Sequence, residues 1–124
     1  MAATWNIRVT DTHLEVQVLG SYSGIKDAVA GLTTIVEQRR AARRWRVLLD
    51  LTVMDGIIPP RDRFLLGTQA AQIWGQRVRA ALLAPPDQIT HFFENVAANN
   101  GAAVQVFADR DAALAWLETG RLAG

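Results

Sequence analysis

Cysteine is absent from the 124-residue chain, which excludes a disulfide framework, a thiol nucleophile and every thiolate metal site. An excess of one charge is also lacking, because thirteen basic residues stand against twelve acidic ones and leave a net charge of +1. Such a balance gives no overall field that would draw the protein onto nucleic acid. No apolar run approaches the roughly 18–20 residues of a membrane span, and residues 1–8 do not have the continuous apolar stretch of a signal peptide. We therefore expect a cytoplasmic protein without a transmembrane segment.

What remains has the composition of a globular protein, since half of the residues are apolar and a fifth are charged. The length suits one hydrophobic core and leaves no room for a second. Linkers, repeats and low-complexity segments are missing, and glycine and proline fall singly or in pairs between periodic segments. The sequence thus predicts a single domain over residues 1–124.

The first third of the chain predicts two strands and a helix. Apolar and polar residues alternate over residues 5–10 and again over 14–18, which is the period of a half-buried strand. Only a short turn at Asp11 and Thr12 separates the two strands, so they must pair antiparallel. Apolar residues then recur at helical spacing, which predicts an amphipathic helix from about Gly24 to Arg43.

The rest of the chain predicts strands and helices in alternation. Residues 46–51 and 78–84 are short apolar runs typical of strands buried on both faces, and residues 103–107 form the last strand. Helices are expected over residues 60–74, after Pro85-Pro86-Asp87 with an end at Asn100-Gly101, and after Asp109 as the helix cap. The order is therefore ββαβαβαβα. Strands two to five should be parallel, with strand one antiparallel at an edge.

This order and several local strings resemble the SpoIIAA-like branch of the STAS domains, named after sulfate transporters and anti-sigma-factor antagonists. The matching strings cover a strand, a second strand, and a strand followed by an acidic cap and a helix: Val47-Leu-Leu-Asp-Leu-Thr52, Arg79-Ala-Ala-Leu-Leu-Ala84 and Val106-Phe-Ala-Asp-Arg-Asp-Ala-Ala-Leu-Ala-Trp-Leu117. The resemblance implies an α/β fold with a mixed five-stranded sheet in sequential order and a single layer of four helices. The branch is grouped with lipid-transfer domains of the CRAL-TRIO type, although this chain is short for their enclosed lipid cavity.

The loop after the third strand is the first candidate site. In regulatory STAS domains the corresponding loop carries a phosphorylatable serine or threonine beside an aspartate. Here Asp55 is followed by Gly56, and the nearest hydroxyl, Thr52, should be shielded at the strand end and bonded to backbone. The segment is either a partner-binding loop at the carboxyl ends of parallel strands, or a helix-start turn in which Ile57 and Ile58 pack ahead of Pro59. The turn is favoured, and no phosphorylation switch is expected.

A run of arginines is the second candidate site. Arg39, Arg40, Arg43 and Arg44, followed by Arg46, place five cations in eight residues. They form either an anion patch or a solvated helix end whose cations offset the negative pole of the helix dipole. The solvated end is favoured, because arginine is the usual base of this chain and no aromatic residues are interleaved to bind nucleic acid.

Sets of residues with catalytic or metal-binding spacing are scarce. His13 and His91 lack metal-ligand spacing, so neither a metal nor another cofactor is expected. The Gly-Ser-Tyr-Ser-Gly string has Tyr22 where a nucleophilic serine would stand, and Ser23 is expected to cap the following helix. Asp50 and Asp55 leave paired-carboxylate chemistry conceivable, but enzyme activity is not supported.

The sequence therefore predicts a non-catalytic binding or regulatory module that acts through an unidentified protein partner or as a homodimer. The alternative is a small carrier of a lipid-like or other apolar ligand, held in a pocket between helix and sheet. The edge strand and Trp5 favour self-association. Trp116 is expected in the core. Trp5 and Trp74 lie at element ends, where an aromatic ring is either half exposed and available to a partner or packed in the core or at its rim, and packing is the default.

Overall fold

Five strands and three α-helices make up the described part of the protein. The structure is a computed structural model that describes residues 3–75, 77–88, 95, 99, 101 and 103–119. A short 3₁₀ helix, η1, precedes β5. In chain order the elements are β1 Thr4–Val9, β2 Leu14–Leu19, α1 Ile25–Ala42, β3 Arg46–Asp50, α2 Pro60–Trp74, β4 Arg79–Leu83, η1 Pro86–Gln88, β5 Ala103–Phe107 and α4 Arg110–Thr119.

The sheet has the predicted topology. Its strand order is β1-β2-β3-β4-β5, with β1 antiparallel to β2 and all other neighbours parallel. The short turn between β1 and β2 permits only the antiparallel pairing, whereas helices α1 and α2 carry the chain back so that β3 and β4 run parallel to β2. β1 therefore lies at one edge of the sheet and β5 at the other.

The number of helices departs from the prediction of four. The described residues contain three α-helices, because the helix expected after Pro85-Pro86-Asp87 falls mostly on residues 89–100, which lie outside the described part of the chain except for Asn95 and Asn99. The other three helices are confirmed. Asp109 caps α4 as predicted, since its carboxylate accepts a hydrogen bond of 3.1 Å from the backbone N–H of Ala112.

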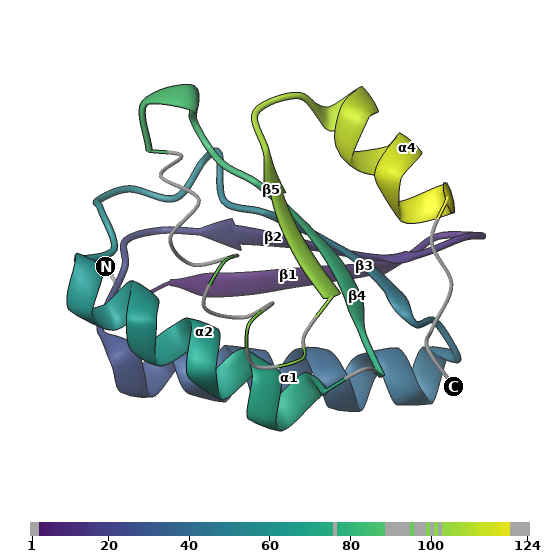
Figure 1. Ribbon diagram of the computed structural model, residues 1–124, viewed down its shortest axis with the longest axis horizontal. Helices are drawn as coiled ribbons and strands as arrows, with labels where there is room; N and C mark the ends of the chain where they lie inside the picture. Colours follow the sequence, from purple (N-terminus) through teal and green to yellow (C-terminus); the bar gives the residue numbers. More distant parts are fainter. Residues whose placement is uncertain are drawn as a thin grey trace.

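The expectation of a single layer of helices is wrong, because helices cover both faces of the sheet. α1 and α2 lie side by side against one face, and α4 lies on the opposite face (Figure 1). Along β3 the side chains of Val47 and Leu49 join the core under α1 and α2, whereas Leu48 between them joins a separate core with Ala113 and Leu117 of α4. Strands that are apolar on both faces need cover on both faces.

Two neighbouring arginines fasten α4 to this second face. Arg46 Nε donates a hydrogen bond of 2.8 Å to the carbonyl of Leu117, and Arg79 Nη2 donates one of 2.8 Å to the carbonyl of Trp116. Carbonyls in the last turn of a helix have no partner within the helix, and cations there also meet the negative end of its dipole. The Arg79 guanidinium lies 3.6 Å from the centre of the Trp116 ring. Burial, together with the nearby charge of Arg46, lowers the pKa of Arg79.

The tryptophans are buried to different degrees. Trp74 is fully buried, in agreement with the default of core packing, and its indole Nε1 donates a hydrogen bond of 2.9 Å to the Leu32 carbonyl of α1. Trp5 is half-buried, and its ring lies against Gly31 of α1. Trp116 is also half-buried and packs against the core under α4 rather than within it. The burial of Trp5 and Trp74, which lie near the ends of β1 and α2, thus depends on their contacts with α1.

We expect Gly31→Ala to destabilise the protein although alanine is the better helix former. A Cβ at position 31 would lie 2.2 Å from the Trp5 ring, so the ring must move. Overpacking of this kind costs about 1–3 kcal/mol and outweighs a gain in helix propensity of about 1 kcal/mol. Urea unfolding should show a net loss in wild type and a gain when the same substitution is made in a Trp5→Ala background. Equal effects in the two backgrounds would contradict the contact.

Candidate functional site

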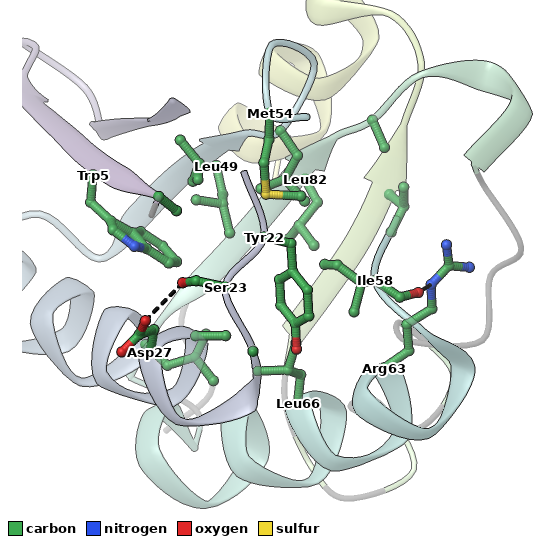
Figure 2. Close-up of a pocket in the computed structure, with 18 residues that line it drawn as sticks. Trp5, Tyr22, Ser23, Asp27, Leu49, Met54, Ile58, Arg63, Leu66 and Leu82 are labelled. Atoms are coloured by element: carbon green, nitrogen blue, oxygen red, sulfur yellow. Dashed lines mark hydrogen bonds between the residues drawn. The ribbon is translucent and has the colours of Figure 1, made fainter. Parts of the chain in front are cut away.

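A cavity of about 110 Å³ lies between the sheet and the helices α1 and α2. Figure 2 shows Trp5, Tyr22, Met54 and Ile58 around it, together with side chains of the sheet floor and of α2. Its walls are predominantly apolar. It lies between helix and sheet, where the alternative hypothesis of an apolar-ligand carrier places a pocket.

The topology of the sheet explains where the cavity lies. Leu51, Ala84 and Val106 line it from the carboxyl ends of three consecutive parallel strands or from the residues that follow them. α1 and α2 both begin at this edge, and Ala28 in the first turn of α1 and Leu66 in the second turn of α2 supply further apolar wall. In open α/β sheets this edge is the usual place for a ligand.

The polar side chains on the cavity wall are paired with other groups of the protein. Tyr22 donates a hydrogen bond of 2.7 Å to the carboxylate of Asp62, and burial, with this bond and this charge, raises the pKa of Tyr22. Ser23 donates a bond of 2.7 Å to the carboxylate of Asp27 (Figure 2). The prediction that Ser23 caps α1 is therefore wrong, because the N-cap is Gly24 and no side chain caps it.

The loop of residues 51–59, between β3 and α2, borders the cavity and contains the predicted partner-binding residues. Met54 and Ile58 line the cavity, whereas Val53 and Ile57 are 49% and 65% exposed. The prediction that Ile57 and Ile58 both pack at the start of the helix is thus right for Ile58 and wrong for Ile57. Arg63 Nε holds the Ile58 carbonyl at 2.9 Å, which fixes the end of the loop to α2.

The centre of this loop is tied to the segment that follows β2. The backbone N–H of Asp55 donates to the Gly20 carbonyl at 2.7 Å, and the N–H of Tyr22 donates to the Asp55 carbonyl at 3.2 Å. Gly56 follows with a φ of 87°, as expected for a glycine that redirects the chain before two prolines. Asp55 itself is exposed. The backbone of Asp55 therefore ties the centre of the loop to the segment that follows β2.

Thr52 does not have the predicted shielded environment. Its side chain is exposed, and its hydroxyl donates to the carboxylate of Asp50 at 2.5 Å instead of to backbone. The same carboxylate accepts the backbone N–H of Thr52 at 2.9 Å, so Asp50 closes a small turn at the end of β3. This turn assigns Asp50 a structural role.

The arginine run is divided by the structure. Arg44 donates a hydrogen bond of 3.0 Å to the Thr10 carbonyl and ties the end of α1 to the turn between β1 and β2, and Arg46 holds α4. Arg43 has a left-handed backbone with φ 57° and ends the helix, while Arg40 is exposed and Arg39 half-buried. At least two of the five cations thus hold backbone carbonyls. An anion patch at Arg39, Arg40, Arg43 and Arg44 stays a prediction.

His13 belongs to a polar network in the hairpin of β1 and β2. Its ring nitrogens lie 3.0 Å from the Thr10 hydroxyl and 3.2 Å from the Glu15 carboxylate, which also pairs with Arg8 and Arg110. Burial alone would raise the pKa of Glu15, but the hydrogen bonds from His13 and Arg110 and the arginine charges together lower it. Among the described residues no group of histidine, aspartate and glutamate side chains is arranged to hold a metal ion.

The architecture is that of a SpoIIAA-like domain, as the resemblance of the sequence predicts. The crystal structure of an anti-sigma factor antagonist from Mycobacterium paratuberculosis matches 94% of this chain and 95% of its own with a TM-score of 0.64 and 13% identity. An uncharacterised protein of the DUF3478 family with a SpoIIAA-like fold from Shewanella loihica matches 93% of both chains with a TM-score of 0.56 and 18% identity. No protein-family model and no curated protein matches the sequence. At these identities the likeness establishes the fold.

The loop of this site can be recognised in the sequence, whereas most of the cavity wall cannot. Tyr22 stands out only because it occupies the place of a nucleophilic serine, and nothing local in the chain marks Met54 or Leu66. The sequence feature that could have indicated the cavity is the apolar residue at the end of each parallel strand, such as Leu51 and Val106. This feature shows which edge of the sheet is apolar, but it does not show whether a cavity remains there between the side chains.

We expect Glu15→Gln to destabilise the protein by about 1–2 kcal/mol at neutral pH, because hydrogen bonds to a charged group are lost. A lowered folded-state pKa means that the ionised carboxylate favours the fold. This stabilisation is present above the ordinary value of 4.5 and is lost as the pH falls through the lowered pKa. Urea unfolding over a pH series should show wild type and variant converging in acid. A difference that is constant with pH would contradict the role of the charge, and Glu37→Gln on the exposed face of α1 is the control.

Proposed function

We propose that the protein is a non-catalytic regulatory module that binds a protein partner through the loop after β3 and the start of α2. The observation that carries the proposal is the exposure of three large apolar side chains in this one segment. Val53, Ile57 and Phe64 are 49%, 65% and 51% exposed, and they will be called the docking residues. Apolar and aromatic side chains are enriched at the centres of protein interfaces.

Hydrogen bonds order the loop, and this ordering makes the exposed side chains better suited to bind a partner. Backbone hydrogen bonds hold Asp55 against Gly20 and Tyr22, and Arg63 holds Ile58. A segment that is already ordered loses little conformational entropy when a partner covers it, so more of the contact energy remains as affinity. The docking residues also lie at the edge of the sheet where this fold brings together several segment ends.

The comparison with solved structures supports a protein partner. The Mycobacterium paratuberculosis protein is, by its name, an antagonist of an anti-sigma factor and thus acts on another protein. We extend to the present chain only the general role of a regulatory interaction module. In the part of the chain that the structure describes, no helix is long and apolar enough to cross a membrane. A cytoplasmic location and a homodimer stay predictions.

Ile57→Asp should weaken binding of the partner at least about tenfold, because a charge would be buried where the interface is apolar. The measurement is quantitative mass spectrometry of proteins that co-purify with the tagged chain from its native cells. Val9→Asp is the matched control, since Val9 is 52% exposed on the edge strand β1, away from the docking residues. Both variants should melt close to wild type. If the same proteins are recovered with Ile57→Asp as with Val9→Asp, the docking surface is wrongly placed.

We expect partner binding to be independent of phosphorylation on this loop. Gly56 has no hydroxyl, and a phosphoryl group on Thr52 would place about −1.5 to −2 charges beside the Asp50 carboxylate, which repels it. Intact-mass measurement of the protein from its native cells should show no phosphate. The expectation is wrong if Thr52 is phosphorylated stoichiometrically and partner binding is lost in Thr52→Glu but kept in Thr52→Val.

A further inference from the structure

The loop after β3 borders two different environments. Met54 and Ile58 contribute to the wall of the cavity, whereas Val53 and Ile57, the residues that immediately precede them in the chain, are exposed docking residues. Each docking residue in the loop is therefore one peptide bond from a side chain that lines the cavity. Where a change in how the cavity is filled moves Met54 or Ile58, the movement passes directly to Val53 and Ile57.

The cavity wall favours an uncharged occupant. Leu49, Leu82 and Val106 of the sheet form its apolar floor. The polar and charged residues of the wall are already engaged with the protein itself. Tyr22 and Ser23 donate to carboxylates, the latter to that of Asp27, and Arg63 Nε donates to the Ile58 carbonyl. A charged ligand would lose its hydration on this surface and gain little in return, whereas an apolar ligand gains from leaving water.

The size of the cavity limits the occupant to a small molecule. Its volume is about 110 Å³. An engineered apolar cavity of about 150 Å³ holds benzene, so the space inside this cavity suits a single aromatic ring or a short hydrocarbon chain. A complete lipid would not fit inside it. Met54 is the wall residue best suited to adjust, because its side chain is unbranched and polarizable.

We propose that the cavity is a binding site for a small uncharged aromatic or aliphatic molecule, and that its occupancy changes the affinity of the docking residues for their partner. The second part rests on the proposed function, and the first does not. The loop shared by the two sites is the physical connection between them. By thermodynamic linkage the coupling is reciprocal, so the factor by which the small molecule changes the affinity for the partner equals the factor by which the partner changes the affinity for the small molecule.

The test uses toluene and benzoate, which share a ring and differ in charge. In methyl-detected NMR titrations of the whole chain, toluene should bind with a dissociation constant of about 1 mM or lower and shift the signals of Leu49, Leu82 and Val106. Benzoate should not shift them. If coupling operates, the methyl signals of Val53 and Ile57 move with the same binding curve although both residues lie outside the cavity.

Two variants of α1 separate the cavity from the helix that borders it. Ala28 lines the cavity, so Ala28→Leu should fill it and weaken toluene binding at least tenfold. Ala30 is exposed on the same helix, and Ala30→Leu should bind toluene like wild type. If Ala28→Leu fails to fold, Ala84→Leu fills the cavity from the end of β4 and replaces it.

The outcomes distinguish the two parts of the proposal. Failure of toluene to bind wild type, or equal binding by the cavity-filling variant and Ala30→Leu, overturns the binding site. Binding of toluene without movement of the Val53 and Ile57 signals overturns the coupling and leaves the binding site standing. Neither result depends on the recovery of a partner with Ile57→Asp, which tests the proposed function separately.

Discussion

The burial of β3 and β4 on both faces is the constraint on which the rest of the structure depends. Leu48 and Leu49 point to opposite sides of the sheet and are both shielded from water, so a helix layer is needed on each side. α1 and α2 supply one layer as the crossovers between parallel strands. In the part of the chain that the structure describes, α4 supplies the other layer, and Arg46 and Arg79 hold its final carbonyls. Two arginines, at the start of β3 and of β4, therefore hold α4 against the second face of the sheet by hydrogen bonds.

The same arrangement creates the site. Parallel strands bring their carboxyl ends to one edge, where α1 and α2 begin and where the loop after β3 crosses. An apolar space remains there between the helices and the sheet, and the loop borders it with Met54 and Ile58 while Val53 and Ile57 are exposed to solvent. One short segment thus joins an interior volume to an exterior surface. In our proposal this connection is the route by which a small molecule in the cavity changes the affinity for a partner.

Most of the fold could be predicted from the sequence because its elements have clear periods. The helix over residues 60–74 and the strand over residues 103–107 agree with the structure to the residue, and the sequential strand order follows from the family resemblance. The features that the sequence does not predict depend on contacts between distant segments. The fully buried Trp74 donates a hydrogen bond to the Leu32 carbonyl of another helix, and the loop that carries the exposed Ile57 is held by a hydrogen bond between Asp55 and Gly20. The cavity draws on residues from most of the elements, and no local pattern records how well they fill the space between them.

The sequential strand order also has a consequence for how the chain folds during synthesis. Each strand pairs with the strand made just before it, so every strand after the first can add to an edge that already exists. The described cover of the second face is made after the strands, because α4 follows β5 in the chain. Until α4 has left the ribosome, Leu48 and Leu83 lack the helix that shields them in the finished fold. A partly synthesised chain of this protein therefore exposes an apolar face of the sheet, and surface of this kind makes folding intermediates prone to aggregation.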